Sequence, residues 1–138
     1  MNLLIHVENY DREGILPSQL DGIRTLAQAL GVERFAFVDA TVDGYFIGGI
    51  WERFPSLSAF LESVDGPLIV FDVPHQGVES TSLKELRPSP ESWLLFGQSM
   101  GFQLSDFADR EEVAWCHLPI GVLYARDVVP IVLWELLS

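Results

Sequence analysis

Short runs of apolar, strand-forming residues alternate with helical patterns along this chain. The clearest run, Leu-Ile-Val-Phe at residues 68–71, lies between the breaker Asp65-Gly66-Pro67 and Asp72. It is apolar on both faces, which is typical of a strand in a parallel sheet that helices cover on both sides. Similar runs predict further strands at residues 3–7, 35–38, 93–96 and 113–116.

Helical patterns fill the intervals between these runs. Pro17-Ser18 begins the first, apolar residues then recur at helical spacing, and Gly31 stands where a helix end favours a residue that tolerates positive φ. Further helices are predicted at 55–64, near 105–110 and at 126–137. Strands that alternate with helices predict an α/β fold, with five or six mostly parallel strands and helices on both faces.

One stretch, residues 43–51, leaves its structure open. Tyr45-Phe46-Ile47 is compatible with a strand, whereas Gly44, Gly48 and Gly49 favour turns or a close backbone approach. Nearby aromatic residues, Trp51 and Phe54 together with Tyr45, are candidates for stacking on a base, but they are as compatible with core packing or a dimer contact.

The size of the chain and its single cysteine restrict the class of protein. A chain of 138 residues, 49% of them hydrophobic, suits one domain spanning 1–138. Cys116 alone closes no intrachain disulfide and builds no Cys-rich zinc site, so we expect a reducing, cytoplasmic setting. The first residues lack a basic signal-peptide region, and no apolar run approaches the roughly 20 residues of a membrane helix. We therefore expect no membrane association.

The charge balance disfavours nucleic acid as an unaided partner. Twenty acidic residues against eight basic ones give a net charge of −12, and the arginines are dispersed among acids. Binding a phosphate backbone requires clustered cations that release counterions. RNA binding would therefore need a fold that gathers the arginines on one face, or a partner that supplies cations.

The loops that follow the three C-terminal strands are the expected ligand site. They span residues 72–77, 97–101 and 119–124, and glycines in them let a backbone approach a ligand closely. In open parallel sheets, ligands bind beyond the carboxyl ends of the strands. Exposed backbone groups there would suit a nucleoside.

Three phrases in this order resemble a known family. The first is Ala29-Leu30-Gly31-Val32, where a helix ends before a strand. The second runs from Leu94 to Ser105 and is similar to L-x-F-G-x-E-G-x-G-L-S. The third begins at Leu118-Pro119-Ile120 and ends in the last helix at Leu133-Trp134-Glu135. Together they resemble the TrmH/SpoU-like branch of the SPOUT (α/β-knot) RNA methyltransferases. The resemblance spans nearly the whole chain.

This resemblance implies a C-terminal trefoil knot, S-adenosylmethionine as cofactor, a homodimer, and ribose 2′-O methylation of tRNA or rRNA. Arg24 resembles the catalytic arginine of the family. The knot loops would bind the cofactor, and the residues expected to do so are Asp72, Val73, Pro74, Phe96, Gly97, Gln98, Gly101, Leu118, Ile120 and Leu123. No metal is expected.

The chain departs from the family at polar positions. Counted from Ala29, Arg24 stands one residue early; Gln98 or Ser99 replaces the glutamate of the second phrase; and Val122-Leu123-Tyr124 replaces S-L-N. Pro130 also falls in the last helix, so we expect that helix to start later than in the family. A catalytically degenerate knot dimer that binds a ligand or a protein partner is therefore the alternative function, and a flavodoxin-like binding domain is a third, weaker one.

Other reactive residue types favour structural roles. His75 and His117 could act as bases or ligands, but no metal-ligand spacing supports them, and Cys116 and His117 would point to opposite faces of a strand. Cys116 is expected to be buried and inert. The acids between 106 and 112 are expected to form a solvated face, and the apolar surface around Trp134 is expected to be an interface rather than core.

Overall fold

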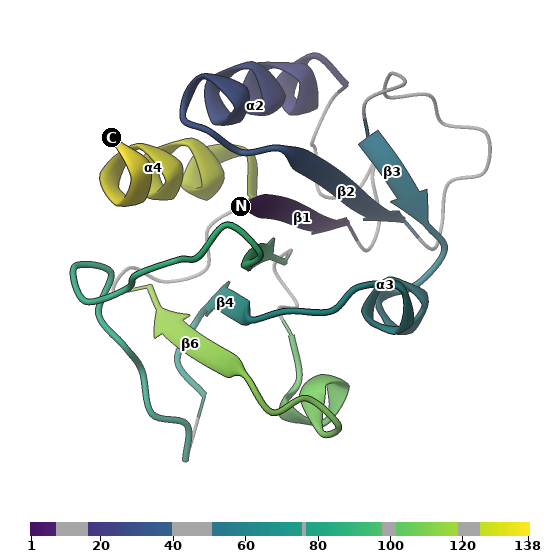
Figure 1. Cartoon of the computed structure of the whole chain (residues 1–138), viewed down its shortest axis with the longest axis vertical. Coiled ribbons are helices and arrows are strands. Elements are labelled where there is room, and N and C mark those ends of the chain that lie inside the picture. Colours follow the sequence, from purple (N-terminus) through teal and green to yellow (C-terminus); the bar gives the residue numbers. More distant parts are fainter. Residues whose placement is uncertain (8–16, 40–50, 76, 98–101, 119–124) are drawn as a thin grey trace.

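A parallel sheet of six strands forms the centre of the molecule (Figure 1). The computed structural model describes residues 1–7, 17–39, 51–75, 77–97, 102–118 and 125–138. The strands are β1 (Asn2–Val7), β2 (Arg34–Asp39), β3 (Trp51–Phe54), β4 (Leu68–Asp72), β5 (Trp93–Phe96) and β6 (Val113–His117). Their order across the sheet is β3-β2-β1-β5-β4-β6, and every pairing is parallel. The prediction of an α/β fold with five or six mostly parallel strands is confirmed.

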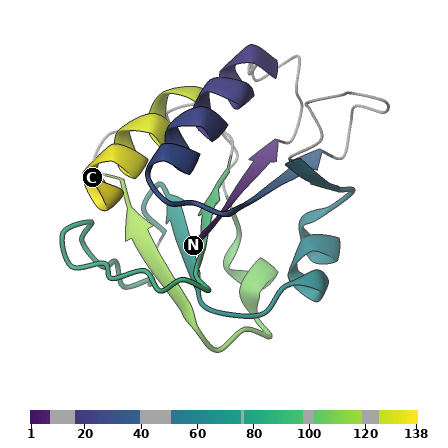
Figure 2. The same cartoon turned by 45° about the horizontal axis from the view of Figure 1, so that its top comes forward.

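Helices cover both faces of this sheet, as predicted. They are α2 (Pro17–Ala29), α3 (Leu57–Ser63), the short 3-10 helix η1 (Leu104–Phe107) and α4 (Ala125–Leu137). Figures 1 and 2 show α2 and α4 side by side on one face, with α3 and η1 on the other. The sheet therefore has two apolar layers to fill.

Alternate residues of each strand supply the two layers. On β1, Leu3 and Ile5 pack in the cluster shared with α2 and α4, whereas Leu4 packs in the cluster shared with α3 and η1. The central strands β4 and β5 are buried at every position. This pattern is the physical reason that both read as continuous apolar runs in the sequence.

The helix boundaries follow local signals in the sequence. Gly31 has a φ of +95° just after α2, as the expected helix end requires. Ser56 caps α3, because its side chain accepts a hydrogen bond from the backbone N–H of Ala59 at 3.1 Å. These two ends are therefore determined by residues within one turn of the helix.

The position of strand β3 and the place of Pro130 within helix α4 were not predicted from the sequence. The strand before α3 is β3, at Trp51–Phe54, while residues 45–47 lie outside the described residues. Helix α4 begins at Ala125, so Pro130 lies in its second turn rather than its first. The helix continues past the proline because Val128, Val129, Val132 and Leu133 are buried in the core and hold both halves against the sheet. The trefoil knot remains a prediction, since loops 98–101 and 119–124 lie outside the described residues.

No helix within the described part of the chain is both long enough and apolar enough to span a membrane.

Candidate functional site

The carboxyl ends of the central strands bring several polar residues to one edge of the sheet. Asp72 ends β4 and is the register partner of His117, which ends β6. Phe96 ends β5 between Phe71 and Ile5. This is the edge at which ligands bind in open parallel sheets.

Asp72 is the structural centre of this edge. Its side chain is buried, with 6% exposed, and its Oδ1 accepts the Val73 N–H at 2.8 Å. Its Oδ2 accepts the N–H of Phe102 at 2.7 Å and lies 2.8 Å from Nε2 of His75. The backbone oxygen of Asp72 also accepts the Leu118 N–H at 2.9 Å. One residue therefore connects the segments that follow β4 and β6 with the segment that enters η1.

His75 stands beside a cavity at this edge. Its side chain is 23% exposed, and its ring packs edge-on against Trp115 with the centroids 5.1 Å apart. The cavity has a volume of about 410 Å³ and is lined by His75, Phe102, Gln103, Leu104 and Ser105. The cavity is shallow and opens to solvent at the carboxyl edge.

The other predicted cofactor residues differ in accessibility. Val73, Gly97 and Leu118 are half-buried and Pro74 is exposed, so all four are accessible at the strand ends. Phe96 is buried and stacks on Phe71 at 4.7 Å, so its side chain belongs to the core. Gln98, Gly101, Ile120 and Leu123 lie outside the described residues.

Arg24 lies on α2, and its guanidinium is engaged within that helix. It donates to Asp21 Oδ1 at 2.7 Å and to Gln28 Oε1 at 2.7 Å. Helix α2 covers the sheet face opposite to α3 and η1. Among the described residues, the hydrogen bonds of Arg24 are all to other residues of α2, so within one chain they do not reach the carboxyl edge.

The pairing of His75 with Asp72 was not predicted from the sequence. The spacing Asp72-x-x-His75 was the available signal, since residues three apart in a turn can meet. The hydrogen bond from the Phe102 N–H to Asp72 could not be predicted from a local pattern, because the two residues are 30 positions apart in the sequence.

His117 and Cys116 point to opposite faces of β6, as predicted. Cys116 is buried, as expected, in the cluster beneath α2 and α4, where burial raises the pKa of its thiol. His117 is on the face of β6 opposite to Cys116, and its ring centroid lies 6.3 Å from that of His75. Among the described residues, no group of three His, Cys, Asp or Glu side chains could hold a metal ion.

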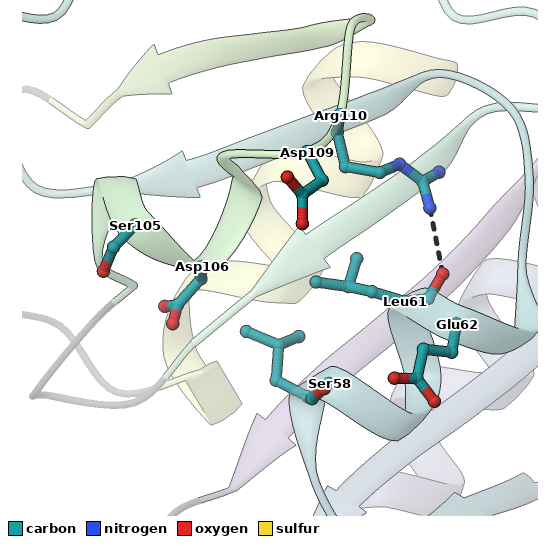
Figure 3. Close-up of a pocket in the computed structure, with 8 residues that line it drawn as sticks. Ser58, Leu61, Glu62, Ser105, Asp106, Asp109 and Arg110 are labelled. Carbon is teal, nitrogen blue, oxygen red and sulfur yellow. Dashed lines mark hydrogen bonds between the residues drawn. The ribbon is translucent and has the colours of Figure 1, made fainter.

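A second cavity lies between α3 and η1 (Figure 3). It has a volume of about 420 Å³, and Glu62, Asp106 and Asp109 line it with exposed side chains. Arg110 faces away from these acids, because its guanidinium donates to the backbone oxygens of Leu61, Val64 and Gly66 at 2.9–3.1 Å. Asp106 and Asp109 are exposed, as are Glu111 and Glu112, so the expectation of a solvated acidic face between 106 and 112 is confirmed. Trp51, considered for base stacking, is instead buried in the core between Phe35 and Phe37.

His6, near the end of β1, has a pKa that differs from the ordinary value of histidine. Burial lowers the pKa of His6 below its ordinary value, and the negative charge of Asp106 opposes this shift more weakly. Its ring packs against Phe102 with the centroids 5.7 Å apart. His6 is therefore held in its neutral form under Phe102.

Acidification is expected to destabilise the protein through His6. The unfolded histidine takes up its proton at about pH 6.5, whereas the folded one does so only at lower pH. Stability contributed by neutral His6 is therefore present above about pH 6.5 and is lost as the pH falls toward the folded pKa. Urea unfolding at about pH 7.5 and pH 5.5 should show a smaller decrease for His6→Gln than for the wild type; equal decreases would contradict this assignment.

Solved structures of methyltransferases share this architecture. TrmJ from Z. mobilis ZM4 matches 100% of this chain and 69% of its own, with a TM-score of 0.68 at 15% identity. The TrmH/SpoU tRNA modifying enzyme of A. aeolicus matches 98% of this chain and 73% of its own, with a TM-score of 0.67 at 15% identity. The chain has a SpoU/TrmH-like SPOUT methyltransferase fold.

A third SPOUT structure holds a ligand. The SpoU methyltransferase AviRb from Streptomyces viridochromogenes, described in complex with AdoMet, matches 99% of this chain and 56% of its own, with a TM-score of 0.65 at 15% identity. No family model and no curated protein matches the sequence. The similarity therefore concerns the fold.

The described residues at the carboxyl edge are compatible with such a cofactor. S-adenosylmethionine carries a cationic sulfonium, which the net charge of −12 of this chain favours. Gly97 and Leu118 are half-buried where β5 and β6 end, so both are accessible to a ligand at this edge. Bound there, the cofactor would supply a methyl group for transfer.

Proposed function

We propose that this protein binds S-adenosylmethionine at the carboxyl edge of its sheet and methylates the 2′-hydroxyl of an RNA ribose, in tRNA or rRNA. The observation that carries the proposal is the whole-chain match to the SPOUT fold, at a TM-score of 0.68 for the first of the structures described above. Another matching structure, at a TM-score of 0.61 and 19% identity, is described as giving insights into the 2-OH methylation of C/U34 on tRNA. The proposed setting is the cytoplasm, where Cys116 stays reduced.

The first test is thermal unfolding with and without the cofactor. A ligand at 100 times its dissociation constant stabilises by about 2.7 kcal/mol, which raises the Tm of a domain of this size by about 8 °C. We expect such a shift with S-adenosylmethionine and with S-adenosylhomocysteine, and none with ATP as the control nucleotide. No shift at millimolar cofactor would contradict the proposal.

The second test follows the methyl group. The protein is incubated with tritiated S-adenosylmethionine and total cellular RNA, and the RNA is digested to nucleosides. Label in 2′-O-methyl nucleosides supports ribose methylation, whereas label only in a base overturns that part of the proposal.

We also propose that the protein forms a homodimer whose interface includes α4. This helix exposes Ile131 and Trp134, at 61% and 57%, in a chain whose other large apolar side chains are mostly buried among the described residues. An exposed apolar pair of this kind is typical of an interaction surface. Sedimentation equilibrium should give a dimer that Trp134→Ala weakens; a monomer for the wild type would contradict it.

A catalytically degenerate SPOUT dimer is the second candidate, and the state of the arginines favours it. Arg24 binds Asp21 within α2, Arg34 forms a two-pronged ion pair with Glu52, and Arg110 binds backbone oxygens. These cations are committed to partners of the chain itself, which leaves fewer for a phosphate backbone. Cofactor binding without methyl transfer to RNA would select this candidate, with a protein partner as its proposed target.

A further inference from the structure

Asp72 and His75 form a hydrogen-bonded pair at the end of β4. Nε2 of His75 lies 2.8 Å from Oδ2 of Asp72. An ionised carboxylate only accepts hydrogen bonds, so Nε2 must carry the proton that it donates. In the neutral ring, Nδ1 is then left with a free lone pair.

The surroundings hold this pair in one geometry. Two backbone N–H groups, from Val73 and Phe102, fix both oxygens of the Asp72 carboxylate. Trp115 packs edge-on against the imidazole at an interplanar angle of 68°. Among the described residues, no hydrogen-bond partner of Nδ1 is found, and the ring lines the cavity shared with Phe102 and Ser105.

The charged groups around His75 leave Asp72 as its one ionic partner among the described residues. From β6, His117 faces it at 6.3 Å between ring centroids. From the η1 side, the cavity is lined by the uncharged Gln103, Leu104 and Ser105. The carboxylate of Asp106 is turned to the Gln103 N–H, at 2.8 Å.

We propose that His75 is the general base that accepts the proton of the hydroxyl to be methylated, with Asp72 as its positioning residue. This inference rests on the proposed function, and it gives the chain a base where Arg24 is engaged within α2. The O–H bond of the acceptor breaks and its proton passes to Nδ1 of His75. The oxygen forms a bond to the methyl carbon while the sulfur–methyl bond breaks and its electron pair stays on sulfur, giving S-adenosylhomocysteine. The positive charge moves from the sulfonium to an imidazolium that the Asp72 carboxylate stabilises.

The first experiment needs no activity. Nitrogen-15 NMR of the cofactor-free protein, above the pKa of free imidazole, should show His75 as the Nε2-protonated tautomer, and Asp72→Asn should reduce that preference. An Nδ1-protonated His75 in the wild type would overturn the inference, because that nitrogen could not accept a proton.

The second experiment separates a structural role from a catalytic one. His75→Gln keeps an amide N–H to donate to Asp72 but removes the base. We expect an unchanged thermal shift with S-adenosylmethionine, a methyl-transfer rate lower by about 10²- to 10⁴-fold, and loss of the acid limb of the pH–rate profile. His117→Gln, the matched control on β6, should keep that limb.

The outcomes distinguish the two proposals. If the wild type transfers methyl groups and His75→Gln keeps both its rate and its acid limb, the base assignment is wrong and the proposed function stands. If the wild type shows neither a cofactor shift nor transfer, the proposed function fails and the base assignment fails with it.

Discussion

Asp72→Ala is expected to lower the free energy of unfolding by about 3 kcal/mol, which corresponds to a decrease in Tm of about 10 °C. The carboxylate is buried, and it accepts hydrogen bonds from the backbone N–H groups of Val73 and Phe102 and from the ring of His75. Alanine leaves these donors without a partner at a site that water reaches poorly, and a buried donor without a partner costs about 1–3 kcal/mol.

Urea unfolding with fluorescence detection measures this effect. Asp65→Ala is the matched control, because Asp65 is exposed and its loss should change the free energy of unfolding by no more than about 0.5 kcal/mol. Asp72→Asn should destabilise nearly as much as alanine, since an amide nitrogen would face a backbone N–H donor. Equal stability of Asp72→Ala and the wild type would show that this carboxylate does not organise the edge.

Trp93→Ala is expected to lower the free energy of unfolding by about 3–5 kcal/mol. Trp93 begins β5 at the centre of the sheet and is 1% exposed. Its ring meets Phe60 of α3 edge-on at 4.9 Å, and the Arg34 guanidinium lies 5.1 Å from its centroid. Removing it leaves a cavity between the sheet and α3 and also breaks both ring contacts.

The measurement is the urea midpoint combined with the slope of the unfolding transition. Leu104→Ala serves as the control for truncation at an exposed site, where the side chain is 48% exposed and a change of less than about 1 kcal/mol is expected. A Trp93→Ala protein as stable as this control would contradict the packing role of Trp93. If Trp93→Ala does not fold, Trp93→Phe should fold with an intermediate loss, since it keeps the contact with Phe60.

Most strands and helices were predictable because their signals are local. The runs at β4 and β5 are apolar at every position since helices bury both faces, and Gly31 marks the end of α2 through its own positive φ. Strand β3 was not found, because two of its four residues, Glu52 and Arg53, are exposed on an edge strand that pairs only with β2. Only Trp51 of β3 is fully buried, so this strand leaves no apolar run in the sequence.

The sequence predicted where the candidate site lies but not the hydrogen bonds that organise it. The loop after β4 was expected to bind a ligand, and the cavity beside His75 lies there. The interactions that organise it join residues far apart in the chain: Phe102 with Asp72 over 30 positions, and Ser80 with His117 over 37. A pattern within one turn of helix or one strand contains no information about such pairs.

The sequence by itself determined the α/β class and the parallel character of the sheet, and it predicted a ligand at the carboxyl ends of the strands. The class and the parallel sheet could be predicted because buried side chains are apolar, and the local spacing of apolar residues indicates which element they belong to. The tertiary structure alone decided the strand order β3-β2-β1-β5-β4-β6, the engagement of Arg24 within α2 and the pairing of buried Asp72 with His75 and Phe102. These depend on hydrogen-bond partners that meet only after the layers have packed, because a buried polar group takes its partner from whatever segment the fold brings beside it.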